Sequence, residues 1–199
     1  MNMQGIPADA TGEVVGDTYW DIHWSESAVL LEDNDKIIEG YVTRYDIQKD
    51  EFEFKVNNGV KVISGNLVKN VAWLDSLVRS PRYLVNAKGY RKDGVPLTGF
   101  FEVLADGNNA LFKKLYLEIL KPNYNAALHN GTKDTRIIKK QAYFYNIGKN
   151  VFKIKSRKSF NPLFKDKAPQ MDAFTKKEKL KFNSEADLIK LFNYFSYLK

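Results

Sequence analysis

The sequence predicts an α+β protein, mainly antiparallel β, in which a strand-rich region is followed by a C-terminal helical segment. Residues 28–155 form a series of short apolar or alternating stretches separated by turn signals. Residues 160–199 instead repeat their apolar side chains with the period of a helix. Strands that come first and helices that come last are typical of this class. A meander, a sandwich and a barrel-like sheet are all compatible with the order.

The first strands are predicted from alternation. In the segment 51–56, Phe52, Phe54 and Val56 alternate with charged residues, which indicates a half-buried strand. The residues Asn57-Asn58-Gly59 then predict a tight turn. Together with strands over 28–31, 36–46 and 60–63, this hairpin gives a meander of four antiparallel strands.

Six further strands are expected between the turn signals that follow. The segment 111–120 is the ambiguous one, because its apolar residues also fit a helical stripe. We assign it as a strand because it follows the apolar segment 100–104 across a hairpin-like turn. Residues 122–134 predict a long exposed loop. The six expected strands are 71–74, 82–88, 98–105, 111–120, 136–145 and 151–155.

Helix signals begin after residue 160. Asn161-Pro162 can start a short helix, and Pro169 suits the first turn of a second one. The last helix is predicted to start at the cap Ser184, with Asp187 completing a capping-box-like pair. Its apolar stripe favours docking on the protein's own sheet, with partner binding as the alternative. The stripe consists of Leu188, Leu191, Phe192, Phe195 and Leu198.

Length and composition fit one domain with a small appendage. The chain has 199 residues, 44% of them hydrophobic, which is enough for a core. We divide it into a flexible N-terminal arm (1–18), an antiparallel β domain (19–158) and a helical appendage packed on that domain (159–199). The apolar runs are far shorter than the ~20 residues of a transmembrane helix. The absence of cysteine excludes disulfides and thiolate metal sites.

Charge is distributed unevenly along the chain. Residues 1–110 hold 11 Lys/Arg and 17 Asp/Glu, whereas residues 111–199 hold 20 Lys/Arg and 7 Asp/Glu. The basic C-terminal half is therefore the natural side for an anionic partner. A solvated surface without a specific role is the alternative. The candidate anion-binding residues are Lys153, Lys155, Arg157 and Lys158.

Aromatic residues suggest a second candidate surface. They recur at short spacing before and along the predicted strands, as in a platform for a sugar or a peptide. Core and edge packing is the more common explanation of such rings. The candidate face consists of Trp20, Trp24, Tyr41 and Tyr45, and Tyr143 and Tyr145 form a similar pair near the last strand.

Recognisable catalytic motifs are missing. The two histidines, His23 and His129, lie far apart and have no partner at metal-ligand spacing. The sequence also contains no phosphate-binding glycine loop and no GxSxG elbow. We therefore expect no cofactor, no metal and no enzymatic activity. An enzyme whose site is assembled from scattered residues is the alternative.

Several short motifs in a fixed order resemble a family of uncharacterised, mostly exported bacterial proteins. The resemblance implies a shared fold, a β-rich domain with C-terminal helices, and a periplasmic or secreted location, but no activity. The chain departs from the family at its start, where no export signal precedes Gly16, so a cytoplasmic location stays open. The motifs are GDTYW at 16–20, GYVTRYD at 40–46, DEFEFK at 50–55, FFEVL at 100–104, YFY at 143–145, FKIK at 152–155, LKF at 180–182 and NYF at 193–195.

Two kinds of binding function follow from these observations. The first hypothesis is a non-enzymatic, exported or envelope-associated binding module, whose partner is an anionic envelope component or another protein. The second is binding of nucleic acid or another polyanion through the basic half, with Phe152 and Phe160 available for stacking.

Overall fold

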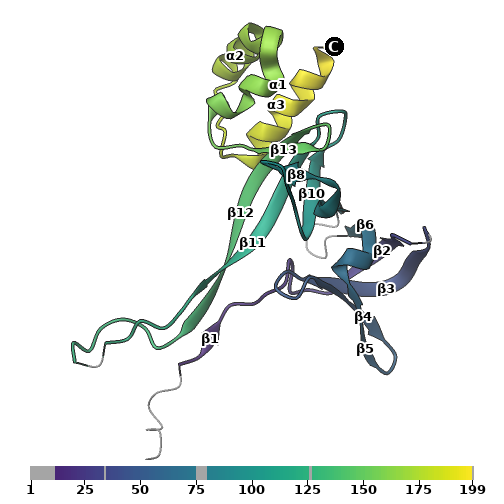
Figure 1. Ribbon diagram of the computed structural model, residues 1–199, viewed down its shortest axis with the longest axis vertical. Helices are drawn as coiled ribbons and strands as arrows, with labels where there is room; N and C mark the ends of the chain where they lie inside the picture. Colours follow the sequence, from purple (N-terminus) through teal and green to yellow (C-terminus); the bar gives the residue numbers. More distant parts are fainter. Residues whose placement is uncertain (1–11, 34, 75–79, 126, 199) are drawn as a thin grey trace, which may run out of the picture.

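The computed structural model describes residues 12–33, 35–74, 80–125 and 127–198. Its strands form one open sheet, mostly antiparallel, and the helices gather at the C-terminal end of the chain (Figure 1). This confirms the predicted α+β class. Most of the predicted N-terminal arm lies outside the described residues. The part that is described contains β1 (Val14–Val15), which pairs in parallel with β12 (Thr135–Ile147).

The first part of the sheet is the predicted meander. Four strands follow one another through tight turns, and the 3-10 turn η1 (Gly65–Leu67) then brings the chain back to pair with the first of them. We call this part the meander lobe. Its strands are β2 (Ser25–Leu31), β3 (Ile37–Asp46), β4 (Glu51–Val56), β5 (Gly59–Ser64) and β6 (Val68–Leu74).

The sheet continues through β7 into a second part, which we call the helical lobe. The order of its strands is β7-β10-β11-β12-β13, and the small β8–β9 hairpin follows β13. The far end of the β11–β12 hairpin extends away from both lobes (Figure 1). The strands are β7 (Pro81–Asn86), β8 (Arg91–Lys92), β9 (Val95–Pro96), β10 (Phe100–Ala105), β11 (Leu111–Leu120), β12 (Thr135–Ile147) and β13 (Asn150–Lys153).

The ambiguous segment 111–120 is a strand. It pairs with β12 without interruption from Leu111↔Tyr145 to Leu120↔Arg136. Long-range pairing decides its conformation, so the helical stripe in its sequence has no structural counterpart. The strand predicted over 82–88 ends earlier, at Asn86, because the Asn86 side chain accepts a hydrogen bond from the Lys88 amide and caps the 3-10 turn η2 (Ala87–Gly89).

The helical segment covers one face of this lobe. It consists of η3 (Arg157–Phe160), α1 (Asn161–Phe164), η4 (Lys165–Lys167), α2 (Ala168–Lys177) and α3 (Glu185–Tyr197). In α3, Leu188, Leu191 and Phe192 are buried against strand residues that include Leu111 and Tyr145. The apolar stripe of the last helix therefore packs on the protein's own sheet.

The predicted capping box of α3 is only half present. Ser184 Oγ accepts a hydrogen bond from the Asp187 amide at 3.4 Å, as expected. The Asp187 carboxylate instead accepts a hydrogen bond of 3.0 Å from the amide of Lys181, a residue in the preceding turn. This carboxylate therefore ties down the chain before the helix. The Lys181 carbonyl also accepts a hydrogen bond of 3.3 Å from the Ser184 amide.

Three clusters of buried side chains form the core. One lies in the meander lobe, includes Tyr45 and Phe52, and extends to Phe100 at the start of β10 in the helical lobe. A second lies between the sheet and the helices. A third lies on the opposite face of the helical lobe, under the β8–β9 hairpin, and includes Phe101 and Phe112. The sheet of this lobe is thus covered on both faces near β10, whereas β11 loses its cover toward residue 120.

Candidate functional site

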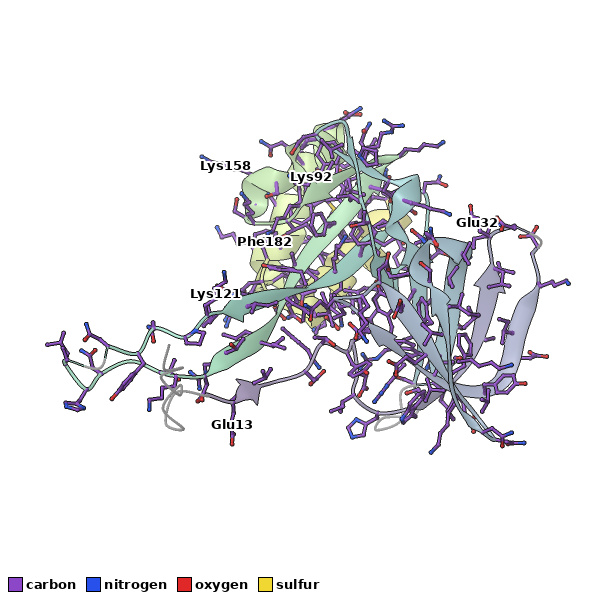
Figure 2. The ribbon with its side chains drawn as sticks, turned by 60° about the horizontal axis from the view of Figure 1, so that its bottom comes forward. Glu13, Glu32, Lys92, Lys121, Lys158 and Phe182 are labelled. Carbon is purple, nitrogen blue, oxygen red and sulfur yellow. The ribbon has the colours of Figure 1, made fainter. Side chains whose placement is uncertain are left out.

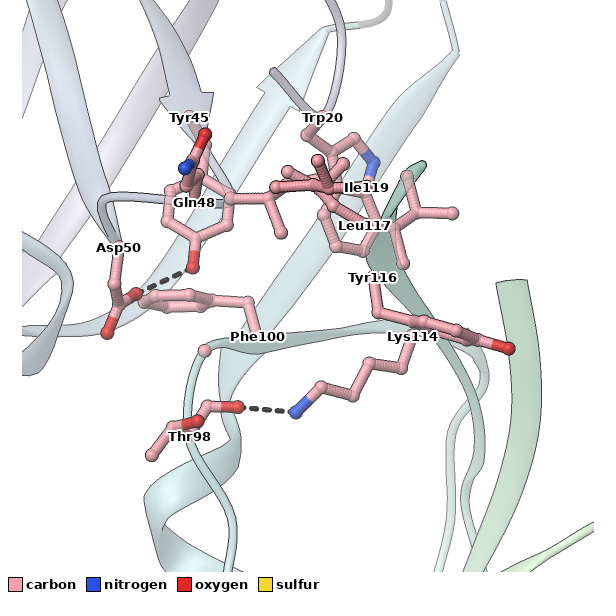
Figure 3. A pocket seen from close by; sticks show the side chains of 13 residues that line it. Trp20, Tyr45, Gln48, Asp50, Thr98, Phe100, Lys114, Tyr116, Leu117 and Ile119 are labelled. Atoms are coloured by element: carbon pink, nitrogen blue, oxygen red, sulfur yellow. Dashed lines mark hydrogen bonds between the residues drawn. The ribbon is translucent and has the colours of Figure 1, made fainter. Parts of the chain in front are cut away.

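A cleft separates the meander lobe from β11 (Figure 3), and we call it the interlobe cleft. Its volume is about 500 Å³. Most of its walls are apolar, as in many ligand sites. The lining residues are Trp20, Tyr45, Ile47, Gln48, Asp50, Thr98, Gly99, Phe100, Lys114, Leu115, Tyr116, Leu117 and Ile119.

The Tyr45–Asp50 pair forms one wall of the interlobe cleft. The Tyr45 hydroxyl donates a hydrogen bond of 2.6 Å to Asp50 Oδ1. Burial of the ring, followed by this hydrogen bond, raises the pKa of Tyr45 well above its ordinary value. The phenol therefore stays protonated and acts as a fixed donor. The Asp50 carbonyl also accepts from the Gly65 amide at 2.6 Å, so the pair holds the β3–β4 turn against η1.

Lys114 forms part of the other wall. Its ammonium group donates to the carbonyl of Thr98 (Figure 3). Burial lowers the pKa of Lys114, and the charge of Asp50 acts in the opposite direction. The cleft therefore presents opposite charges from its two sides, a carboxylate from the meander lobe and an ammonium from β11.

A second hollow adjoins the interlobe cleft and shares Lys114 and Tyr116 with it. We call it the lysine groove; its volume is about 610 Å³. Four of its lining side chains are lysines, and none is acidic. The lining residues are Lys92, Leu97, Lys114, Tyr116, Ala142, Phe144, Lys153 and Lys155.

Sheet register explains how the lysines meet. Lys114 is opposite Ala142 on β12, and Phe144, two residues further, is opposite Lys153 on β13. Side chains two residues apart share a face, so Lys114 on β11 and Lys153 on β13 lie on the same face of the sheet, with β12 between them. The small side chain of Ala142 leaves the space between them open. The β8–β9 hairpin supplies Lys92.

The groove also contains a partly exposed aromatic ring. The Lys153 ammonium lies 5.9 Å from the ring centroid of Tyr116, which is within reach of a cation–π contact. Tyr116 is 42% exposed. Lys92 is paired with its neighbour Asp93 at 2.7 Å on the exposed rim. Such an exposed pair contributes little free energy, so it leaves the lysine available to a ligand.

The predicted anion-binding residues are divided by the structure. Lys153 and Lys155 line the lysine groove. Arg157 instead forms a bidentate pair with Asp172, donates to Asn161 at 3.0 Å and lies over the ring of Phe164. The Arg157 guanidinium lowers the pKa of Asp172. Lys158 is exposed and does not line the groove (Figure 2).

Sequence reasoning missed Lys92 and Lys114, although both belong to the groove. The alternation of Phe112, Lys114 and Tyr116 signals one strand face. The signal was obscured by the helical stripe of the same segment. The position of Lys92 beside the tight turn Asp93-Gly94 carries no comparable signal, since turn lysines are usually solvated.

The four residues of the predicted aromatic face do not form one exposed surface. Trp20 and Tyr45 are buried in the core of the meander lobe, with 5% and 2% of their surfaces exposed. Tyr41 is 45% exposed and lies over a shallow hollow of the outer sheet surface. Trp24 packs on Arg44, whose guanidinium carbon is 4.4 Å from the ring centroid.

Arg44 belongs to a closed cluster. Its guanidinium lies between Trp24 and Tyr19 and pairs with Glu53 at 2.7 Å. The Tyr19 hydroxyl donates to the other oxygen of Glu53 at 3.1 Å. All charged groups of this cluster are matched within it, so it stabilises the segment that enters β2 and presents no free charge to a ligand.

Tyr143 and Tyr145 lie beneath the helices. The Tyr143 hydroxyl donates to Glu185 at 3.2 Å, and the Tyr145 hydroxyl donates to the carbonyl of Ser159 at 2.7 Å. Burial raises the pKa of each of these two phenols to about 12. Both rings therefore hold the helical segment on the sheet.

Groups for catalysis or metal binding are sparse. Within residues 12–33, 35–74, 80–125 and 127–198, three or more His, Asp or Glu side chains nowhere gather as metal ligands would. His23 Nδ1 is 2.9 Å from Asp21 Oδ1, but both lie on an exposed turn. His129 lies in the tip of the β11–β12 hairpin, 3.5 Å from the Tyr124 hydroxyl.

Comparisons with protein-family models, with curated proteins and with solved structures find no match to this chain. The family resemblance and the location that it implies therefore stay predictions. In the part of the chain that the structure describes, no helix has both the length and the apolar character that a membrane crossing requires.

Proposed function

We propose that this protein is a non-catalytic binding protein that holds an anionic ligand in the lysine groove. The observation that carries the proposal is the convergence of four lysines from three separate segments on one groove whose lining contains no carboxylate. Like charges repel, so ammonium groups that converge on a groove without a carboxylate in its lining are stabilised when an anion binds. The exported or envelope-associated location remains a prediction beside this proposal.

Two features of the groove support an extended ligand rather than a single small anion. Its four ammonium groups are spread along a hollow of about 610 Å³, whereas an inorganic anion would fill only a small part of it. Tyr116 adds a partly exposed ring between the lysines, on which an apolar or planar group of the ligand can pack.

The salt dependence of binding tests the proposal. The probes are fluorescent oligoglutamate, a heparin fragment and an oligothymidylate, each measured by anisotropy at low and moderate salt. Affinity should fall steeply with salt, because displaced counterions make charge-driven binding sensitive to ionic strength. The groove variant changes Lys92, Lys114, Lys153 and Lys155 to Gln. The Lys114→Gln change keeps a side-chain donor for the Thr98 carbonyl.

A matched control removes the same charge elsewhere. It changes the exposed residues Lys158, Lys176, Lys177 and Lys181 to Gln. The groove variant should lose binding to every anion that the parent binds, while the control variant should retain most of it. Equal binding by the two variants would return the lysines to the role of a solvated surface and overturn the proposal.

A further inference from the structure

The interlobe cleft lies along a free edge of the sheet. Pairing of β10 with β11 ends at Glu102↔Lys113, whereas pairing of β11 with β12 continues to Leu120↔Arg136. Among the described residues, no strand pairs with 114–120 on the side opposite β12. This part of β11 is thus an edge strand.

Gly99 explains why the neighbouring strand stops. Its φ of +71° is in the left-handed region that glycine adopts at little cost. Its carbonyl accepts a hydrogen bond from the Ala87 amide at 2.8 Å. The chain that precedes Phe100 is therefore turned toward η2 and away from β11, and the edge beyond Lys113 is left open.

The phase of the ladder identifies the groups that this edge presents. The Asn146 amide donates to the Ala110 carbonyl, so residue 110 is a hydrogen-bonded position of the β11–β12 ladder. Such positions alternate along an antiparallel strand. The even residues of β11 therefore bond to β12, and the backbone groups of Leu115, Leu117 and Ile119 are directed to the opposite side, into the interlobe cleft.

The lining of the cleft agrees with this phase. Both odd and even residues of β11 contribute to it: Lys114 and Tyr116 from one face, and Leu115, Leu117 and Ile119 from the other (Figure 3). A hollow over one face of a strand would be lined by residues of one parity only. The cleft thus follows the edge of β11, with the lysine groove on one side of it and apolar side chains on the other.

We propose that an extended acidic peptide of a partner protein binds as an additional strand along residues 114–120 of β11. This inference rests on the proposed function, because the lysine groove supplies the charge that selects the peptide. Strand addition uses main-chain hydrogen bonds for affinity and alternate side chains for specificity. Four residues of such a strand span about 13 Å.

The chemistry of the two sides defines the peptide. Its side chains on one face meet Lys114 and Tyr116, whose ring lies beside the Lys153 ammonium, and acidic residues fit there. Its side chains on the other face meet Leu115, Leu117 and the buried aromatic rings of the meander lobe, and apolar residues fit there. The favoured sequence therefore alternates acidic and apolar residues.

The open edge also distinguishes a peptide from a nucleic acid. A strand edge presents carbonyl acceptors beside amide donors, and a second strand satisfies both. A phosphate backbone offers acceptors alone, so it would satisfy the amides of the edge and leave the carbonyls unmatched. The edge therefore favours a peptide, while the lysine groove by itself would accept either polymer.

A peptide with alternating Glu and Val, about eight residues long, is the probe. The peptide affinity, measured by anisotropy, should fall about tenfold or more when the alternate peptide amides that face β11 are N-methylated. This control changes the peptide alone and leaves the protein intact. Hydrogen exchange at Leu115, Leu117 and Ile119 should slow when the unmodified peptide binds.

Leu117→Pro tests the same edge from the protein side. Its amide faces away from β12, so proline removes a donor of the free edge and none from the ladder. Thermal unfolding first checks that the variant folds; Leu117→Ala, which keeps the amide, is its control. The proline variant should lose peptide binding about tenfold or more and keep heparin binding.

The outcomes separate this inference from the proposed function. Equal binding of the methylated and unmodified peptides would overturn strand addition, while loss of heparin binding in the groove variant would still support the lysine groove. Binding of oligothymidylate without binding of the peptide would replace the peptide with a nucleic acid. Unchanged binding of every probe by the groove variant would overturn the proposed function itself.

Discussion

Lys113 Nζ and Glu185 Oε2 lie 3.1 Å apart and join β11 to the first turn of α3. The same ammonium is 2.8 Å from Oε2 of Glu102 on β10. Lys113 and Glu102 are both buried, whereas Glu185 is 37% exposed on its side chain. The buried Lys113 ammonium therefore connects β10 and β11 to α3, which lies far from these strands in the sequence.

Lys113→Met should destabilise the fold, because it leaves the Glu102 carboxylate buried without its nearest cation. Loss of one partner of a buried pair costs about 3–5 kcal/mol. The lower end applies here, since Arg82 Nε also lies 3.8 Å from Glu102. Glu185→Gln should cost less than about 1 kcal/mol, because the exposed pair is screened by water. Chemical denaturation measures both.

A double variant provides the check on this explanation. Lys113→Met combined with Glu102→Leu removes both buried charges and should recover most of the lost stability. If the double variant is as unstable as Lys113→Met alone, packing of the lysine side chain, and not its charge, holds this position.

Phe192→Ala should weaken the docking of α3 on the sheet. The ring is 4% exposed and packs with Tyr145 and Phe160. Its loss should lower the free energy of unfolding by about 3–5 kcal/mol. The melting temperature should fall by about 5 °C or more. Tyr197→Ala, on the same helix but 84% exposed, is the control. Equal melting of the two variants would mean that α3 contributes little to the fold.

Stability should decrease at high pH because of the buried tyrosines. Burial raises the pKa of Tyr143 and Tyr145 from 10.0 to about 12. A pKa that is higher in the folded state stabilises the protein fully below the unfolded value. That contribution is lost as the pH rises from about 10 to about 12. Tyrosinate absorbance should show phenols that ionise late.

The double variant Tyr143→Phe with Tyr145→Phe should remove part of that late ionisation. The slope of the unfolding free energy against pH should become shallower between about pH 10 and about pH 12. An unchanged slope would assign the alkaline transition to the lysines and to the other buried phenols, of which Tyr45 is the most strongly shifted.

Local patterns were sufficient for most elements of the fold. The alternation in 51–56 and the turn at Asn57-Asn58-Gly59 reappear as β4 and its hairpin with β5. The cap Ser184 and the apolar stripe after it reappear as α3. Each of these signals depends on residues a few positions apart, so it can be recognised from the sequence alone.

The candidate site was only partly predictable. Lys153 and Lys155 were identified because they are close together in the sequence, and Arg157 was included for the same reason. The structure turns Arg157 toward Asp172 on α2, a partner that no local pattern indicates. Lys92 and Lys114 join the groove through strand pairing across distant segments, which sequence spacing does not show.

The sequence by itself determined the class of the protein, the order of strands before helices, the uneven charge and the apolar face of the last helix. These properties follow from composition and from periods of two or 3.6 residues. The sequence assigned 111–120 as a strand with a helix as the competing interpretation; only the tertiary structure decided between the two, left the edge of this strand free beyond Lys113 and placed four lysines in one groove. Sheet register sets all three, and register depends on the pairing of residues far apart in the chain.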